Sequence, residues 1–274
     1  MTMRLWFSMF TLMPTKTVSA DGSTPFFLYI ALWFLVITHV LRGLITLLIL
    51  FPFIGRVSKN DHIQRWSKRL LKIFGIELRV NSSNLMPQGP FLIASNHVSW
   101  MDIHVINALK PIRFVAKSEV ANWPIFGWMA KQLGTVFIRR DSSKHARQVV
   151  NELADLLKTQ SICIFPEGTS TIGKSVQSFK PNLFEAAVVA KVPVCTLALA
   201  YFDQKTGKHS KTPAFIGDMG LMTSMARILK SRNLRVELTF FAPISAQSDE
   251  AMDRKGLALY SQEQIAQYLA SHCN

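Results

Sequence analysis

Apolar residues dominate one continuous segment near the start of the chain. From Phe26 to Ile54 the sequence reads FFLYIALWFLVITHVLRGLITLLILFPFI, 29 residues with a single permanent charge, that of Arg42. A helix needs about 20 apolar residues to cross the hydrocarbon core of a bilayer. The parts before and after the Arg42–Gly43 pair are each somewhat shorter than that. The pattern therefore predicts apolar helical structure with a junction at this pair.

Three arrangements of this segment are compatible with its length. One tilted helix could span the membrane, with the Arg42 side chain reaching the interface. Two half-length helices could instead lie in one leaflet as an anchor. A buried helix pair in a soluble core is the third arrangement, but an apolar run this long is uncommon in soluble cores. We therefore expect residues 25–72 to hold membrane-anchoring helices and a basic juxtamembrane stretch.

Positive charge follows the apolar segment directly. Asp61 is the only acidic residue among six Lys and Arg residues: Arg56, Lys59, Arg65, Lys68, Arg69 and Lys72. Basic residues beside an apolar segment mark the cytoplasmic side and are attracted to anionic headgroups. An ordinary solvated helix face would carry the same charges, and only the neighbouring apolar run favours the membrane. Residues 1–24 resemble a secretory signal superficially, but Ser8 and Thr11 interrupt the apolar stretch, so we interpret them as a leader.

From about Lys72 onward, short β-rich runs alternate with helical patterns. The predicted strands are Ile76–Val80, Phe91–Ser95, Arg113–Ala116, Thr135–Ile138, Ser161–Phe165, Val194–Ala200, Pro213–Ile216 and Leu234–Phe241. Predicted helices are Ser143–Lys158, with Asp141 and Ser142 as capping residues, Lys180–Lys191 and Met219–Ser231. This alternation predicts an α/β domain over residues 73–274, a mixed, largely parallel sheet flanked by helices. Functional residues of such sheets collect where strands run into helices.

Composition narrows the class of protein. A chain of 274 residues with 49% hydrophobic residues and a mean hydropathy of +0.20 is too apolar to be disordered and long enough for a sizeable core. Three cysteines without C-x-x-C spacing indicate neither a disulfide framework nor a zinc site. With 31 Lys and Arg against 17 Asp and Glu, the net charge of +14 favours a polyanionic partner. The positive hydropathy favours an anionic membrane over nucleic acid.

The first candidate site follows the predicted strand Phe91–Ser95. His97 and Asp102 stand five residues apart in the segment NHVSWMD. If the turn between them folds back, the carboxylate accepts an imidazole N–H and the other ring nitrogen is free to act as a general base. No serine or cysteine nucleophile has a suitable context, so a substrate hydroxyl is the natural proton donor. Taken alone, the pair fits a structural histidine beside a helix-capping aspartate better.

Other candidate residues also lie where predicted strands end. In the segment FPEGTS, the turn of Glu167, Gly168 and Thr169 permits close approach of a ligand and could bind an anion through its amides. A plain turn explains the same residues. Lys117 and Arg139 end their own strands, where an ammonium and a planar guanidinium suit a phosphate. Each cation by itself is more typical of a solvated surface charge.

Five segments together carry a family resemblance: NHVSWMD, FVAKSEVANWPIFGW, GTVFIRR, FPEGTST and KVPVCTLALAY. Their order and spacing resemble the glycerolipid acyltransferases, the lysophosphatidate-acyltransferase-like family marked by H-x4-D followed by F-P-E-G-T. The resemblance covers roughly Leu71 to Ile244. It implies an α/β sheet domain behind an N-terminal two-helix membrane anchor, in agreement with the hydrophobic pattern.

The resemblance also implies roles for single residues. His97 and Asp102 correspond to the catalytic dyad of the family. Arg139 and Glu167 correspond to residues that contribute to acceptor binding, and Lys117 to a phosphate contact. In the turn of the third motif, Gly168 permits the backbone conformation and Thr169 lies beside the substrate. The resemblance implies no metal ion and no cofactor.

Two positions depart from the family pattern. Ser170 stands where the family commonly has arginine, so a planar phosphate clamp is missing there. Thr196 stands where the fourth motif usually has a second proline, in a strand leading to Tyr201 that we interpret as core. Bacterial lyso-ornithine lipid acyltransferases also have serine or threonine in place of that arginine. The segment FIGDMGLMTSMARIL resembles the same group.

The resemblance implies transfer of a fatty acyl group from acyl-CoA or acyl carrier protein to a lysolipid hydroxyl. The expected acceptor is 1-acyl-sn-glycerol-3-phosphate, with lyso-ornithine lipid as the alternative. Expected partners are membrane lipids and the thioester carrier, without nucleic acid, and the expected location is the cytoplasmic side of a bacterial inner membrane. A hydrolase of acyl thioesters or lipids, using water, and a non-catalytic lipid-binding module are more remote alternatives.

Overall fold

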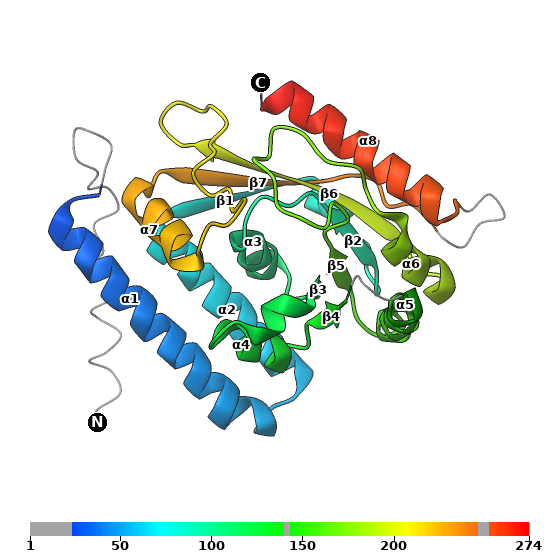
Figure 1. The fold of residues 1–274 in the computed structure, drawn as a ribbon, viewed down its shortest axis with the longest axis horizontal. Coiled ribbons are helices and arrows are strands. Elements are labelled where there is room, and N and C mark those ends of the chain that lie inside the picture. Colours follow the sequence, from blue (N-terminus) through cyan, green and yellow to red (C-terminus); the bar gives the residue numbers. More distant parts are fainter. Residues whose placement is uncertain (1–23, 140–142, 246–251, 274) are drawn as a thin grey trace.

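The computed structural model of the chain describes residues 24–139, 143–245 and 252–273, which form helices around a single sheet (Figure 1). The α-helices are α1 (Phe26–Ile45), α2 (Arg56–Phe74), α3 (Met101–Leu109), α4 (Phe126–Gln132), α5 (Ser143–Leu157), α6 (Glu185–Ala190), α7 (Leu221–Ser231) and α8 (Arg254–His272). The strands are β1 (Ile76–Asn81), β2 (Leu92–Ser95), β3 (Arg113–Lys117), β4 (Val136–Ile138), β5 (Ile162–Ile164), β6 (Val194–Asp203) and β7 (Leu234–Phe240).

The strands of the described residues form one sheet in the order β1-β7-β6-β2-β5-β3-β4. Only the β6–β7 pair is antiparallel, and every other neighbouring pair is parallel. The predicted mixed, largely parallel sheet flanked by helices is therefore confirmed. Because β6, β2, β5, β3 and β4 run in the same direction, their carboxyl ends meet at one edge, where ligands bind in sheets of this kind.

Each face of the sheet is covered by its own set of helices. Ile93, Cys195 and Tyr201 point to the face that packs against α1, α2, α3 and α7. Leu92 and Ala198 point to the opposite face, which α5, α6 and α8 cover. Figure 1 shows α8 and α3 on opposite sides of the sheet. Since both faces of β6 are covered, its residues are buried almost without interruption, as is typical of central strands.

The apolar segment forms one continuous helical stretch, without the break at Arg42–Gly43 that two half-length helices would require. α1 passes through both residues and continues through a π-helical turn (Thr46–Leu50) and a 3-10 turn (Phe51–Phe53). This stretch is long and apolar enough to cross a membrane. The second helix of the region is α2, which carries the basic residues. Of the predicted leader, all but Thr24 lies outside the described residues.

Gly43 lies where α1 and α2 approach each other, and α1 continues through it. A Cβ atom at this position would lie 2.8 Å from Nε1 of Trp66, so only glycine fits without a shift. One turn away, His39 Nε2 donates to the Trp66 carbonyl (3.1 Å) and Trp66 Nε1 donates to the His39 carbonyl (3.2 Å). The two rings stack with centroids 4.5 Å apart. The predicted anchor region is therefore packed onto the sheet domain.

Several elements differ from the sequence prediction, since α3 and α4 were not among the predicted helices. Residues 213–216 do not form a strand, because the Phe215 amide donates to the Val98 carbonyl (2.9 Å) and Pro213 has no amide to donate. Helix α8 was not predicted, since its apolar residues do not follow one narrow stripe. Its start is fixed by Asp253, whose side chain accepts from the amides of Lys255 (3.0 Å) and Gly256 (2.8 Å).

The remaining predicted strands and helices are present with small shifts at their ends. The predicted helix Lys180–Lys191 divides into a 3-10 turn (Pro181–Phe184) and α6. The predicted helix Met219–Ser231 corresponds to α7, and Ser143–Lys158 corresponds to α5. The proposed capping residues of α5, Asp141 and Ser142, lie outside the described residues.

Substitution of Gly43 by valine tests the contact between α1 and α2. The added atoms would collide with the Trp66 ring, and overpacking of this kind typically destabilises a protein by about 1–3 kcal/mol. We expect a lower melting temperature in detergent for Gly43→Val. The matched control is Gly55→Val, because a Cβ at Gly55 meets nothing within 4 Å. Equal melting temperatures for the two variants would contradict the proposed packing.

Candidate active site

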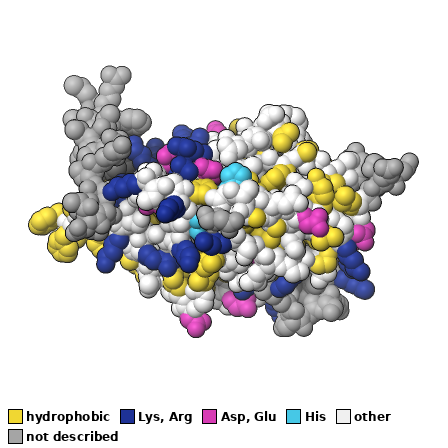
Figure 2. All heavy atoms as spheres, turned by 90° about the horizontal axis from the view of Figure 1, so that it is seen from above, with side chains coloured by type: hydrophobic (Ala, Val, Ile, Leu, Met, Phe, Trp, Pro, Cys, Tyr) yellow, Lys and Arg dark blue, Asp and Glu magenta, His cyan; other side chains and the backbone are white. Residues whose placement is uncertain are grey.

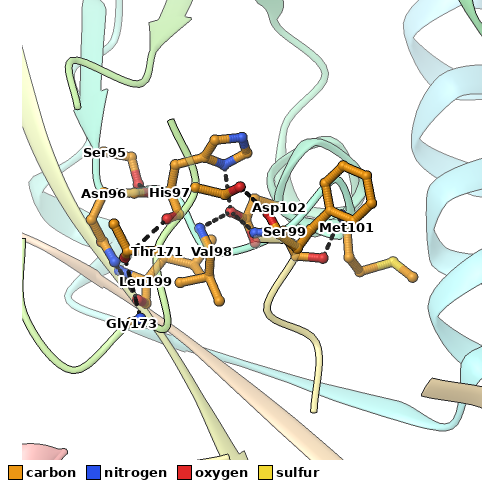
Figure 3. A network of polar contacts seen from close by, with 12 residues as sticks. Ser95, Asn96, His97, Val98, Ser99, Met101, Asp102, Thr171, Gly173 and Leu199 are labelled. Atoms are coloured by element: carbon orange, nitrogen blue, oxygen red, sulfur yellow. Dashed lines mark hydrogen bonds and ion pairs between the residues drawn. The ribbon is translucent and has the colours of Figure 1, made fainter. Parts of the chain in front are cut away.

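The side chains of His97 and Asp102 meet just beyond the carboxyl end of β2 (Figure 3). Nδ1 of His97 lies 2.8 Å from Oδ2 of Asp102. The carboxyl group is completely buried, whereas the imidazole retains 21% of its exposure. An ionised carboxylate can only accept, so Nδ1 carries the proton and Nε2 has the free lone pair. Figure 3 shows the second ring nitrogen pointing away from Asp102.

Asp102 receives three hydrogen bonds besides the one from His97. The backbone amides of Val98 (2.7 Å) and Ser99 (2.9 Å) donate to Oδ2, and the hydroxyl of Tyr201 donates to Oδ1 (2.8 Å). Hydrogen bonds to the charged form stabilise a carboxylate that water cannot reach. Asp102 also stands in the first turn of α3, where the helix dipole favours an anion. The turn between the two residues therefore folds back around the carboxylate.

The loop that carries His97 is fixed from several sides. The side chain of Asn96 donates to the Leu199 carbonyl (2.9 Å) and accepts from the Leu199 amide (2.8 Å). The Thr171 amide donates to the His97 carbonyl (2.9 Å). The Phe165 ring stacks on the imidazole, with centroids 4.1 Å apart. These contacts hold the imidazole plane in place.

Glu167 lies behind this loop and is only 2% exposed. Its Oε1 accepts from the backbone amide of His97 (2.8 Å), and its Oε2 accepts from the amide of Gln177 (2.9 Å). Burial raises the pKa of Glu167, and the two backbone hydrogen bonds oppose that shift. Because backbone amides occupy both oxygens, the structure places Glu167 as a support of the His97 loop. Its acceptor-binding role, implied by the family resemblance, stays a prediction.

The other residues singled out in the sequence lie along the same sheet edge. Lys117 pairs with Ile138 across β3 and β4, so Lys117 and Arg139, both exposed, end adjacent strands. Gly168 has a φ of +70°, which glycine adopts without strain. Thr169 is exposed after it. The structure thus gathers these residues at the carboxyl ends of β3, β4 and β5.

Ser170, in place of the family arginine, takes part in a backbone contact. Its hydroxyl donates to the Phe215 carbonyl. The hydroxyl therefore ties the turn after β5 to the segment 213–216.

Tyr201 is the site residue that the sequence analysis missed. We interpreted it as core, and it is indeed fully buried on β6. Its contact with Asp102, 99 residues away, depends on the pairing of β6 with β2, in which Leu197 lies opposite Ser95. Burial and the neighbouring carboxylate raise the pKa of Tyr201 well above its usual value, so the phenol remains protonated and acts as a donor.

Comparisons with known proteins assign this chain to a class of enzymes. The family model described as Acyltransferase matches residues 77–200, a range that includes the pair His97 and Asp102. A Lyso-ornithine lipid O-acyltransferase of Pseudomonas aeruginosa is 36% identical over 201 residues, which cover 73% of this chain and 75% of that protein. A 1-acyl-sn-glycerol-3-phosphate acyltransferase of Neisseria gonorrhoeae is 33% identical over 214 residues, which cover 78% and 82%.

The chain therefore belongs to the acyltransferase family and is an enzyme of that class. A solved structure is similar as well, the 1-acyl-sn-glycerophosphate (LPA) acyltransferase PlsC from Thermotoga maritima. It aligns with a TM-score of 0.65 over 89% of this chain and 94% of that chain. Its 20% sequence identity establishes the shared fold only.

Glu167→Ala distinguishes a support of the loop from a contact with the acceptor. Removal of the carboxylate leaves two amides without partners, and a buried unsatisfied group costs about 1–3 kcal/mol. We expect both the melting temperature and kcat to fall, with the KM for the acceptor nearly unchanged. The control is Glu152→Ala, at an exposed position on α5. A raised acceptor KM with an unchanged melting temperature would show that Glu167 binds the acceptor.

Proposed function

We propose that the protein transfers a fatty acyl group from an acyl thioester, either acyl-CoA or acyl carrier protein, to the free hydroxyl of a lysolipid. The observation that carries this proposal is the imidazole of His97, oriented by a buried carboxylate at the carboxyl ends of parallel strands. Among the described residues, none forms a hydrogen bond with Nε2 of His97. This nitrogen is therefore available to a substrate hydroxyl.

The reaction needs one proton acceptor that later becomes a donor. Nε2 of His97 takes the proton of the lysolipid hydroxyl while that oxygen attacks the carbonyl carbon of the thioester. The C–S bond then breaks, and the sulfur leaves as a thiol with the proton returned by the imidazolium. Asp102 stabilises the imidazolium between these steps and remains ionised. No metal ion and no cofactor takes part in this scheme.

An apolar cavity near His97 and Asp102 suits the fatty acyl chain. It has a volume of about 390 Å³ and is lined by side chains of α1, α2, α3 and α4, among them Trp66, Ile103 and Phe126. Phe114, another lining residue, stacks on Phe165, which in turn stacks on His97. Two stacked aromatic rings, those of Phe114 and Phe165, therefore lie between the cavity and the proposed base.

The charges around this cavity suit a ligand with an apolar body and an anionic end. Burial lowers the pKa of His104 to about 3, so the cavity wall formed by α3 is neutral at physiological pH. Arg42, Arg65 and Arg69 also line the cavity, whereas no described lining residue is acidic. Acyl thioesters and lysolipids both combine a hydrocarbon chain with negatively charged groups.

Lysophosphatidate is the acceptor that we propose first. Lys117 and Arg139 end the adjacent strands β3 and β4 on the edge that carries His97, and both side chains are exposed. A guanidinium and an ammonium together suit a phosphate monoester. The 1-acyl-sn-glycerol-3-phosphate acyltransferase of Neisseria gonorrhoeae supports this choice by its similarity.

Lyso-ornithine lipid is the second candidate acceptor, and Ser170 favours it. The family arginine at this position would add a phosphate clamp, but the serine hydroxyl contacts the Phe215 carbonyl instead. An acceptor without a phosphate does not need that clamp. The relative from Pseudomonas aeruginosa, whose name specifies lyso-ornithine lipid, supports this alternative.

We further propose that α1 anchors the enzyme in one leaflet of the membrane. One side of the helical stretch formed by α1 and the π-helical turn is buried against the rest of the protein from Leu32 to Leu47, which favours a position along one leaflet. The other side of this stretch exposes large apolar side chains, including Phe34, Ile37, Leu41 and Ile45 of α1 and Leu48 of the π-helical turn. On the face shown in Figure 2, Lys and Arg side chains gather in the left half of the view. We place the catalytic domain on the cytoplasmic side of a bacterial inner membrane.

Product analysis with a panel of lysolipids tests the proposed reaction. Purified protein receives one labelled acyl donor with lysophosphatidate, with lyso-ornithine lipid or without acceptor, and products are identified by mass. We expect phosphatidate as the main product, little donor consumption without acceptor, and a loss of at least about 10²-fold in rate for His97→Ala. A strong preference for lyso-ornithine lipid would replace the proposed acceptor. Rapid release of free fatty acid without acceptor would instead indicate a hydrolase.

A charge on the exposed side of α1 tests the anchor. Leu41→Glu places a carboxylate where the helix is proposed to contact lipid tails, since Leu41 is 50% exposed. We expect weaker binding to vesicles that contain anionic lipids, with activity in detergent solution retained. Leu259→Glu on α8 is the matched control, because Leu259 has a similar exposure of 56%. Equal vesicle binding by the two variants would contradict the anchor.

A further inference from the structure

The two oxygens of the Asp102 carboxylate receive different numbers of hydrogen bonds. His97 and the backbone amides of Val98 and Ser99 all donate hydrogen bonds to Oδ2. Among the described residues, only Tyr201 contacts Oδ1, with its hydroxyl 2.8 Å away. Both side chains are completely buried, so water does not offer a substitute donor. Rotation of the carboxyl group, and the share of its charge left for His97, therefore depend on this one phenol.

We propose that Tyr201 is a positioning residue that fixes the carboxylate plane of Asp102 and limits how strongly this carboxylate holds the protonated imidazole. The inference rests on the proposed function of His97 as the base. A donor on Oδ1 draws negative charge away from Oδ2. With this donor in place, the imidazolium returns its proton more readily to the leaving sulfur.

The other titratable groups around the pair do not take over this role. Cys163 on β5 and Glu167 after β5 are the remaining ones that interact electrostatically with Asp102 among the described residues. Burial and the charge of Asp102 raise the pKa of Cys163, so this thiol stays neutral. Both oxygens of Glu167 accept backbone amides. Neither group donates a hydrogen bond to Oδ1.

Tyr201→Phe removes the hydroxyl and retains the packed ring. We expect kcat to fall by about tenfold or more, the size expected for one hydrogen bond to a charged group, with KM values within about twofold. The carboxylate would hold the imidazolium more strongly, so the proton would stay on His97 to higher pH. The acidic limb of the kcat profile therefore moves to higher pH.

Tyr268→Phe is the matched control. Tyr268 is 9% exposed, and its hydroxyl lies 3.4 Å from a carboxylate oxygen of Glu237, on the side of the sheet covered by α8. Loss of this hydroxyl should leave the pH profile unchanged. In an Asp102→Asn background, Tyr201→Phe should have little further effect on kcat. An unchanged acidic limb for Tyr201→Phe, or a full tenfold loss in the Asp102→Asn background, would overturn the inference.

A chemical titration separates this inference from the proposed function. Diethyl pyrocarbonate modifies neutral imidazole, and peptide mass spectrometry follows the extent of modification at His97 without any substrate. We expect the pH dependence of this modification to shift to higher pH in Tyr201→Phe and to stay constant in Tyr268→Phe. The same curve for wild type and Tyr201→Phe would refute the role of Tyr201. Absence of lysolipid acylation alongside a shifted curve would refute only the proposed reaction.

Discussion

The active site depends on the compensation of one buried negative charge. A carboxylate enclosed at 0% exposure is tolerated only when hydrogen bonds replace the water that it has lost. Asp102 receives four such bonds, three from the loop after β2 and one from Tyr201 on β6. The folding of the loop and the orientation of the imidazole are therefore the same event.

The order of strands in the sheet supplies this environment. β2, which precedes His97, lies between β6 and β5. Asn96 anchors the loop to β6 through Leu199, and Glu167 anchors it to the turn after β5. The cations Lys117 and Arg139 follow on the next two strands of the same edge. The proposed chemistry and the proposed binding of an anionic acceptor thus share one edge, next to the cavity between α1 and α3.

Short-range pattern predicted the sheet class and most strands and raised the contact between His97 and Asp102 as a possibility, whereas their role as a dyad came from the family resemblance. The remaining features depend on contacts between residues far apart in the sequence, which a local pattern does not reveal. The register of β6 against β2 brings Tyr201 to Asp102, and the contact with Trp66 carries α1 through Gly43. The resemblance implied acceptor binding for Glu167, whereas its burial and its hydrogen bond from the His97 amide became visible only in the fold. The backbone amides that donate to its carboxylate belong to His97 and Gln177, and no local sequence pattern connects these residues with Glu167.

We propose that the acyl group moves directly from the thioester sulfur to a lysolipid oxygen, with His97 acting only as the general base. Rapid-quench analysis of a single turnover, with a labelled acyl thioester and lysophosphatidate, tests this claim most directly. Loss of label from the thioester should match its appearance in lipid in time, without label on the protein, and His97→Ala should slow both together. A labelled acyl-protein that forms before the lipid product, or an unchanged rate in His97→Ala, would contradict the account.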